Sequence, residues 1–248
     1  MKDEVIVITG GASGIGRETA KLLAADGAKV IISDINEDAA RKVAEEIKKS
    51  GEEAVHYKCN VAKKEEVQAL VEFTVKTYGT ITGYFNNAGI GAQVPFLDLD
   101  PDEYHRVVDI NQSGVYYGLY YAANKMKSLG VKNGKIVNTA SIYGFVGAEL
   151  SAHYNATKAA VVSLTKSAAQ ALTKDGIRVT GVAPGFTRTA ILEALPEEAL
   201  EMLKGAHLRG KLLEAIEIAQ VAKFLFSDES VAINGSTVLA DDGFLAVK

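Results

Sequence analysis

The sequence predicts an α/β fold in which one doubly wound parallel sheet carries helices on both faces. Short apolar runs alternate along the chain with longer segments of helical periodicity, the pattern of repeated strand–helix–strand units. The strand candidates are continuously apolar rather than alternating, which is typical of strands buried on both faces. Apart from the strand–helix unit itself, no repeat, linker or low-complexity tract divides residues 1–248, so we expect a single domain.

The individual elements follow from the apolar runs and from the turn residues that end them. The predicted strands are residues 5–8, 29–33, 54–58, 84–86, 135–139, 178–183 and 237–240. The predicted helices are residues 17–26, 37–50, 63–78, 102–129, 152–174 and 215–225. The second helix is typical, because Ala40, Val43, Ala44 and Ile47 share one face and Gly51 follows its end.

Composition and charge exclude several classes of function. Of the 248 residues, 48% are hydrophobic and 23% charged, the balance of a globular protein with a sizeable core. The net charge is −4 and the basic residues are dispersed, which argues against nucleic acid or an anionic membrane as the main partner. The first apolar run is too short for a signal peptide, and no run reaches the length of a membrane span. The single cysteine, Cys59, cannot form an intramolecular disulfide, and we expect a cytoplasmic protein.

A glycine-rich turn stands between the first predicted strand and the first predicted helix. Residues 9–16 read Thr-Gly-Gly-Ala-Ser-Gly-Ile-Gly. Glycines let the backbone approach a pyrophosphate, and the N-terminus of the following helix offers free N–H groups and partial positive charge. A glycine cluster also occurs in purely structural turns, but the strand–turn–helix context favours a Rossmann-type nucleotide site. Its expected contacts are Gly10, Ser13, Gly14, Ile15 and Gly16.

The choice of nucleotide depends on Asp34, which ends the second predicted strand. A carboxylate there accepts hydrogen bonds from the adenosine ribose hydroxyls and repels a 2′-phosphate. Neither Ser13 nor Ile35 offers a compensating positive charge. The sequence therefore favours NAD over NADP as cofactor. An alternative interpretation is that Asp34 caps the helix that begins near Glu37, and it could do both.

Tyr154 and Lys158 lie four positions apart on a predicted helix, so their side chains share one face. An ordinary tyrosine, with a pKa of about 10, is a poor base at neutral pH, and a nearby ammonium favours the phenolate. The pair predicts acid/base chemistry at the tyrosine. Taken alone, the spacing is common, and a helix-surface pair is the alternative interpretation.

The whole chain resembles the short-chain dehydrogenase/reductases, in their short single-domain branch. The matching motifs occur in the family's order: residues 9–16, Asn86-Asn87-Ala88-Gly89, Asn111 within Asn-Gln-Ser-Gly, Ser141, Tyr154 with Lys158, and Pro184-Gly185. The resemblance implies an NAD(H)-dependent oxidoreductase that moves a hydride between nicotinamide and a secondary alcohol or ketone. Two alternatives stay open: a 3-ketoacyl-(acyl carrier protein) reductase, and a nucleotide-binding regulator without turnover.

The resemblance also implies roles for individual residues. Tyr154 exchanges the proton at the reacting oxygen, and Ser141 hydrogen-bonds that oxygen as an oxyanion donor. Lys158 holds the nicotinamide ribose and tunes Tyr154, while Asn111 holds a water that relays the proton. The remaining cofactor contacts are expected at Asn60, Val61, Asn87, Ala88, Gly89, Pro184, Gly185, Thr187 and Thr189.

Three positions depart from the family pattern. Asn60 stands where an aspartate is usual, keeping a carbonyl acceptor for the adenine but losing the charge. Thr187 stands where an aliphatic residue is common. The tail reads Asp241-Asp242-Gly243 where a second glycine is usual, which leaves the backbone conformation there open.

Residues 185–214 break the strand–helix rhythm and predict a lid over a small-molecule substrate, with Phe186 among its contacts. A plain surface excursion is the alternative. The lid's side chains are mostly apolar, and His207 and Arg209 are expected at its rim. This composition favours a compact apolar substrate over an acyl chain on a carrier protein.

The four histidines lack metal-ligand spacing, so we expect no metal site. The resemblance implies a homotetramer, with Tyr116, Tyr117, Tyr120 and Tyr121 at an interface or, equally, half of them in the core.

Overall fold

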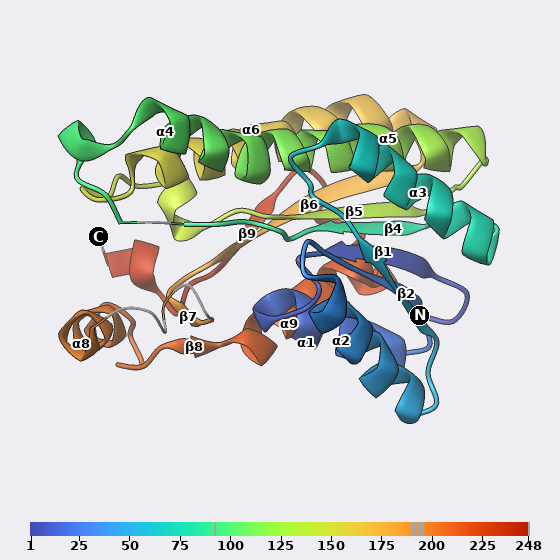
Figure 1. Ribbon diagram of the computed structural model, residues 1–248, viewed down its shortest axis with the longest axis horizontal. Helices are drawn as coiled ribbons and strands as arrows, with labels where there is room; N and C mark the ends of the chain where they lie inside the picture. Colours follow the sequence, from blue (N-terminus) through green and yellow to red (C-terminus); the bar gives the residue numbers. More distant parts are fainter. Residues whose placement is uncertain (92, 190–191, 193–195, 248) are drawn as a thin grey trace.

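A seven-stranded parallel sheet forms the centre of the computed structural model, which describes residues 1–91, 93–189, 192 and 196–247 (Figure 1). The strand order is β3-β2-β1-β4-β5-β6-β9. The strands are β1 (Val5–Thr9), β2 (Lys29–Asp34), β3 (Ala54–Lys58), β4 (Gly83–Asn86), β5 (Gly134–Thr139), β6 (Ile177–Pro184) and β9 (Thr237–Ala240). Because the order reverses between β1 and β4, the sheet is doubly wound, and the predicted fold class is confirmed.

Helices cover both faces of this sheet. Figure 1 shows one layer below the sheet and a second layer above it. The lower layer holds α1 (Gly14–Ala25), α2 (Glu37–Lys49) and α9 (Ala215–Phe226). The upper layer holds α3 (Lys64–Tyr78), α4 (Pro101–Val108), α5 (Gly114–Ser128) and α6 (Ala152–Leu172).

Strand β1 shows why the strands are continuously apolar. Val5 and Val7 pack into the core beneath α3, α5 and α6, whereas Ile6 and Ile8 pack into the core beside α1, α2 and α9. All four side chains are at most 2% exposed. Since successive side chains of a strand point to opposite faces, burial on both sides requires an apolar residue at every position.

The helical region predicted at 102–129 is divided in the structure. A π-helical turn, Asp109–Ser113, separates α4 from α5 without ending the helical path. Asn111 lies within this turn and is fully buried. Its Oδ1 accepts from the N–H of Ile90 and its Nδ2 donates to the carbonyl of Ile90, both at 2.8 Å. Such turns are common at functional sites, and here the turn aims an amide at the end of β4.

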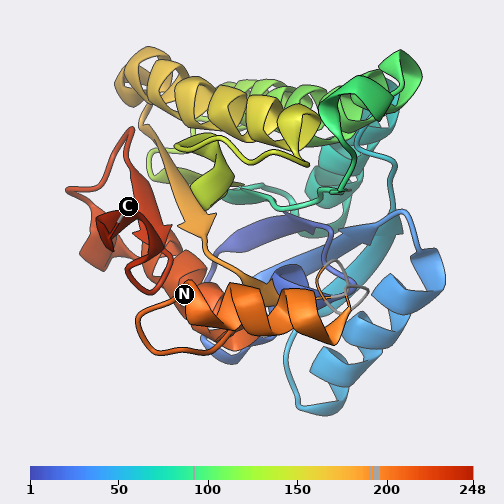
Figure 2. The ribbon, with the colours of Figure 1, turned by 90° about the vertical axis from the view of Figure 1, so that its left-hand side faces the viewer.

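Residues that follow β6 form a second, smaller unit at one end of the molecule. Strands β7 (Thr187–Arg188) and β8 (Leu213–Glu214) pair in parallel, and α8 (Glu197–Gly205) lies in the foreground of Figure 2. The sequence had indicated no strand or helix here. Five positions of the predicted lid at 185–214, residues 190–191 and 193–195, lie outside the described residues.

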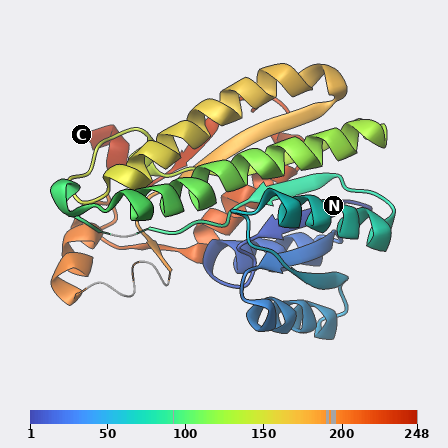
Figure 3. The same ribbon diagram turned by 45° about the horizontal axis from the view of Figure 1, so that its top comes forward.

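Helices α5 and α6 run side by side along the upper face (Figure 3). A chain of buried polar groups fixes α6 over the sheet: Asn86 Nδ2 donates to Asn138 Oδ1 at 2.8 Å, and Asn138 Nδ2 donates to Thr165 Oγ1 at 3.0 Å. The chain therefore joins β4, β5 and α6. This matters because α6 carries Tyr154 and Lys158.

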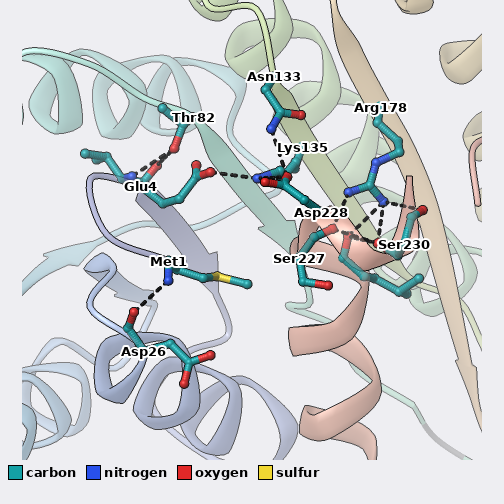
Figure 4. A network of polar contacts seen from close by, with 12 residues as sticks. Met1, Glu4, Asp26, Thr82, Asn133, Lys135, Arg178, Ser227, Asp228 and Ser230 are labelled. Carbon is teal, nitrogen blue, oxygen red and sulfur yellow. Dashed lines mark hydrogen bonds and ion pairs between the residues drawn. The ribbon is translucent and has the colours of Figure 1, made fainter. Parts of the chain in front are cut away.

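Two buried cations stabilise the amino-terminal edge of the sheet, where strands β5 and β6 begin (Figure 4). Lys135, 3% exposed, contacts Glu4 at 2.6 Å and Asp228 at 3.1 Å. Arg178 donates from Nη1 to Ser230 Oγ at 2.7 Å and from Nη2 to the carbonyl of Ser227 at 2.9 Å. The two side chains join β5 and β6 to the residues after α9. Within the described part of the chain, no helix combines the length and the apolar character that crossing a membrane requires.

Candidate active site

The predicted site residues follow the carboxyl ends of six parallel strands. Parallel strands place these ends on one edge of the sheet, so residues far apart in the chain converge there. Asn87 illustrates the convergence. Its Nδ2 donates to the carbonyls of Thr9 and Gly10 at 3.1 Å each, and its Oδ1 accepts from Thr139 Oγ1 at 3.3 Å. Asn87 thus joins the ends of β1, β4 and β5.

The glycine turn after β1 is packed too tightly for side chains. A Cβ at Gly10 would lie 2.8 Å from the Cα of Ala88, and Gly10 has a φ of +62°. A Cβ at Gly16 would lie 2.2 Å from the carbonyl oxygen of Gly10. The turn therefore presents bare backbone at the N-terminus of α1, which fits the pyrophosphate of a dinucleotide. Thr189 approaches the same turn, with its Cγ2 3.3 Å from a Cβ built at Gly14.

Asp34 is half-buried at the end of β2 and faces the glycine turn. Its Oδ2 accepts from the N–H of Ala12 at 3.2 Å, and its Oδ1 accepts from the N–H of Asn36 at 3.0 Å. The residue that caps α2 is Asn36, whose Oδ1 accepts from the N–H of Ala39 at 3.1 Å. The interpretation of Asp34 as the cap of this helix is therefore wrong. Its carboxylate is fixed beside the glycine turn, where a ribose would lie.

Asn60 and Val61 follow β3. The Asn60 Oδ1, expected to face the adenine, accepts from the N–H of Ala62 at 3.1 Å. The backbone N–H of Asn60 donates to Glu66 Oε2 at 2.8 Å, and this bond lowers the pKa of Glu66. Val61 is buried against Gly114, at the start of α5. Asn60 thus stabilises the loop before α3, and it does so through the side-chain carbonyl oxygen that was expected to face the adenine.

Tyr154 and Lys158 occupy successive turns of α6, and the two side chains meet. Lys158 is 3% exposed, and its Nζ lies 5.5 Å from the centre of the Tyr154 ring. The same Nζ donates to the backbone carbonyl of Thr139 at 2.7 Å. The interpretation of the pair as a helix-surface contact is therefore wrong, because the lysine lies inside the protein between α6 and the end of β5.

Burial shifts the pKa of both groups in the uncharged direction. Desolvation raises the pKa of Tyr154 to about 12, and a hydrogen bond with the Ser141 side chain opposes the rise. Desolvation lowers the pKa of Lys158 to about 8. At neutral pH the phenol is therefore protonated and can donate a proton to a developing alkoxide. Accepting a proton from an alcohol requires positive charge beside the ring, which Lys158 carries below pH 8.

Ser141, Asn111 and Gly89 surround this pair. Ser141 is buried after β5, and its Oγ accepts from the N–H of Tyr143 at 3.2 Å. A Cβ built at Gly89 would lie 3.2 Å from Asn111 Oδ1 and 3.7 Å from Lys158 Nζ. The segment after β4 therefore lies close to both Asn111 and Lys158, and the four predicted catalytic residues share one neighbourhood.

An aromatic cluster, which consists of Tyr143, Phe186, His207 and Phe244, continues from Tyr154. The Tyr143 ring lies 6.3 Å from the Tyr154 ring and 5.9 Å from the Phe186 ring, centre to centre. Phe186 in turn lies 5.5 Å from His207 and 5.3 Å from Phe244. Leu192 and Leu203 also pack here. Phe186 was predicted as a substrate contact, whereas Tyr143 and Phe244 were not singled out.

The backbone at Gly185, just after β6, packs closely against His207 and against Asp241. A Cβ at Gly185 would lie 2.7 Å from His207 Nε2 and 3.0 Å from the Cα of Asp241. Pro184 ends β6 and is buried, and Thr187 Oγ1 donates to the carbonyl of Gly185 at 3.0 Å. The hydroxyl that replaces the family's usual aliphatic side chain is therefore bound within its own turn.

The tail departure at Asp242 has a structural use. Asp242 adopts a φ of +47°, the left-handed conformation that glycine usually supplies and that aspartate tolerates. Its carboxylate accepts from the backbone N–H of Arg209 at 3.0 Å and from Arg209 Nε at 2.9 Å. Arg209, which was expected at the substrate rim, is thereby tied to the residues after β9. The same segment continues to Phe244 of the aromatic cluster.

The other predicted features divide between core and surface. Tyr117 and Tyr121 pack against the core, while Tyr116 and Tyr120 of α5 are 49% and 52% exposed. His153 is buried. His207 is buried as well, so its predicted place at the rim of the lid is wrong, while Met202 of the predicted lid is 77% exposed. Across the residues that the structure describes, His, Cys, Asp and Glu side chains nowhere gather in a group of three or more that could hold a metal ion.

Comparison with known proteins yields close relatives. A family model described as "Enoyl-(Acyl carrier protein) reductase" matches residues 10–245. The chain is 41% identical to the cyclohexanol dehydrogenase of Acinetobacter sp. (strain SE19), over 98% of this chain and 95% of that protein. It is 40% identical to the 2,5-dichloro-2,5-cyclohexadiene-1,4-diol dehydrogenase of Sphingobium indicum, over 100% and 99% of the two chains. The crystal structure of levodione reductase matches with a TM-score of 0.95 at 35% identity, covering 100% of both chains.

Proposed function

The chain belongs to the short-chain dehydrogenase/reductase family and interconverts secondary alcohols and ketones, and we propose that it does so with NAD(H) on a compact, apolar ring substrate. The resemblance inferred from the motifs is confirmed. The relatives are named as dehydrogenases and reductases, so the alternative of a regulator without turnover falls away.

The chemistry is assigned to Tyr154, Ser141, Lys158 and Asn111. The bound nicotinamide supplies or accepts the hydride. Tyr154 donates its proton to the ketone oxygen during reduction and takes the hydroxyl proton during oxidation. Ser141 donates a hydrogen bond to the same oxygen and stabilises its developing negative charge. Lys158 binds the nicotinamide ribose and favours the phenolate, and Asn111 connects the site to solvent water.

The preference for NAD(H) rests on Asp34. Its carboxylate is held beside the glycine turn by the N–H groups of Ala12 and Asn36. There it accepts hydrogen bonds from the ribose hydroxyls, and its charge opposes a 2′-phosphate. Asn87, Ala88, Gly89, Pro184, Gly185, Thr187 and Thr189 complete the cofactor side, with Asn60 and Val61 nearest the adenine.

The aromatic cluster carries the substrate proposal. Its rings continue directly from Tyr154, so a substrate whose oxygen meets Tyr154 places its carbon skeleton against apolar side chains. Such a surface binds a compact hydrocarbon ring, and no lysine or arginine is among the described residues that form it, so it does not favour a carboxylate or phosphate. Two of the relatives are named for six-membered ring alcohols, which agrees with this shape. We assign residues 185–214 as the lid that encloses the ring.

The protein is further proposed to act as a homotetramer. Tyr116 and Tyr120 stack on the outer face of α5, with ring centres 6.1 Å apart and both about half exposed. Large exposed aromatic residues on one helix suit a contact with a second copy. Light scattering coupled to size exclusion measures the assembly, and a monomer at micromolar concentration would contradict it.

The test of the proposed function is a steady-state comparison of substrates and cofactors. Cyclohexanol and cyclohexanone are assayed with NAD(H) and NADP(H) beside an open-chain 2-alcohol, acetoacetyl thioesters and enoyl thioesters. We expect the highest kcat/KM for the ring compounds with NAD(H). Robust reduction of a carrier-bound thioester with little activity on free ring ketones would contradict the substrate and promote the acyl carrier protein alternative.

A further inference from the structure

His207 is a buried histidine that the proposed chemistry does not use, and both of its ring nitrogens are engaged. It is 4% exposed, on the turn between α8 and β8. Its Nδ1 lies 2.8 Å from the backbone carbonyl oxygen of Lys211. Its Nε2 accepts from the backbone N–H of Phe186 at 3.1 Å. One imidazole thus joins the turn before β8 to the first residues after β6.

These two partners fix the protonation state of the ring. A carbonyl oxygen only accepts, so Nδ1 carries the hydrogen, and an amide N–H only donates, so Nε2 must present its lone pair. Only the neutral ring with its proton on Nδ1 satisfies both partners. A second proton on Nε2 would place an N–H group against the N–H of Phe186 and break that hydrogen bond.

The bond to Phe186 reaches the substrate side of the site. The Phe186 backbone is held on both sides, because its carbonyl also accepts from the N–H of Leu213 at 2.9 Å. Its ring stands between His207 and Tyr143, and Tyr143 contacts the Tyr154 ring. The position of Phe186, and with it the apolar surface next to Tyr154, therefore depends on the imidazole.

We propose that His207 is a positioning residue that holds Phe186 in the substrate site, and that removal of its Nε2 acceptor releases Phe186 and weakens substrate binding. This inference rests on the proposed function, since it assigns Phe186 to the substrate side. It predicts that loss of the acceptor lowers the affinity for the ketone and leaves the chemical step unchanged.

The kinetic test compares ketone KM and kcat at one pH among wild type, His207→Gln and His207→Phe. His207→Phe lacks any acceptor for the Phe186 N–H, so its KM should rise on the order of tenfold, while kcat at saturating ketone stays within about twofold of wild type. His207→Gln keeps an acceptor at the end of its side chain, so its KM should stay near the wild-type value.

A second measurement does not depend on turnover. Hydrogen exchange of the Phe186 amide should be faster in His207→Phe than in wild type, and His207→Gln should keep the wild-type protection. A His207→Phe protein with the wild-type KM and the wild-type exchange would overturn the proposal. If His207→Phe fails to fold, His207→Asn, whose shorter side chain does not reach the Phe186 N–H, decides by the same two measurements. If wild type turns over no alcohol or ketone, the proposed function fails, while the exchange experiment still decides the role of His207.

Discussion

The ammonium nitrogen of Lys158 donates to the backbone carbonyl of Thr139 at 2.7 Å, inside the protein and beside the Tyr154 ring. A single carbonyl compensates poorly for a buried charge, and burial lowers the pKa of Lys158 from 10.5 to about 8. The lysine required for chemistry therefore lowers the free energy of unfolding, so its replacement should raise stability while it removes activity.

Lys158→Met should stabilise the protein while abolishing most turnover. Below pH 8 wild type holds a buried charge, which costs on the order of 3 kcal/mol at most and is partly offset by the bond to Thr139. Between about pH 8 and 10.5 the unfolded chain keeps a proton that the folded chain releases, so wild-type stability rises with pH across this window. The difference in stability between the variant and wild type should therefore be smaller at pH 10 than at pH 7. Urea unfolding at pH 7 and pH 10, with the exposed Lys166→Met as control, measures this; a variant less stable than wild type at pH 7 would contradict it.

Tyr154→Phe should retain the fold and bind NADH with nearly unchanged affinity. The ring keeps its packing against Tyr143, but the proton donor is lost, so kcat should fall on the order of a hundredfold or more. Fluorescence titration with NADH and steady-state kinetics separate the two effects. Tyr78→Phe, at the end of α3, is the matched control. Turnover near the wild-type rate would exclude Tyr154 as the acid/base.

Asp34→Ser should narrow the preference for NAD(H) over NADP(H). The change removes the charge that opposes a 2′-phosphate, and it also removes the acceptor for the N–H of Ala12. We expect a lower kcat/KM with NAD(H) and a higher one with NADP(H). Asp38→Ser, on the exposed side of α2, controls for the loss of a nearby carboxylate. A wild-type preference for NADPH would refute the assignment before any variant is made.

Arg178→Met should destabilise the protein without altering the chemistry. The guanidinium donates to Ser230 Oγ and to the carbonyls of Leu225 and Ser227, and its loss removes these charge-assisted bonds and leaves Ser230 Oγ as the donor shared by the two carbonyls. We expect a loss of about 2–4 kcal/mol in the free energy of unfolding. Arg41→Met removes an exposed arginine of α2 and should reduce the free energy of unfolding far less than Arg178→Met does. Equal losses in the two variants would show that the buried contacts of Arg178 contribute little.

The parts of the fold that sequence could predict are those governed by local periodicity. Strand β1 is apolar at every position because both of its faces are buried, and α2 is amphipathic because one face is exposed. The glycine turn was recognisable because its conformation depends on residue type. Boundaries shifted by a few residues at most, as for α1, which begins at Gly14 rather than Arg17.

What sequence could not predict depends on contacts between distant residues. The π-helical turn at Asn111 leaves the local helical pattern intact and is fixed by Ile90, 21 positions earlier. Phe186 and His207 are also 21 positions apart, and Arg209 and Asp242 are 33 apart. Asp242 stands where a glycine is usual, and this departure was the one indication in the sequence that the residue has a special role, which is its contact with Arg209. His207 was expected at the rim of the lid, and nothing in the neighbouring sequence indicated that it is buried against the backbone of Phe186.

The two buried cations, Lys135 and Arg178 (Figure 4), lie near the starts of β5 and β6, whereas Tyr143 and Phe186 of the aromatic cluster follow the carboxyl ends of these strands. For biocatalyst engineering this division is useful. Thermostabilising substitutions can be confined to the edge that Lys135 and Arg178 hold, while libraries that retune ring size or enantioselectivity are directed at Tyr143, Phe186 and Phe244. Because the two sets lie at opposite ends of β5 and β6, their effects should combine additively, and a stabilised protein can be prepared before its selectivity is changed.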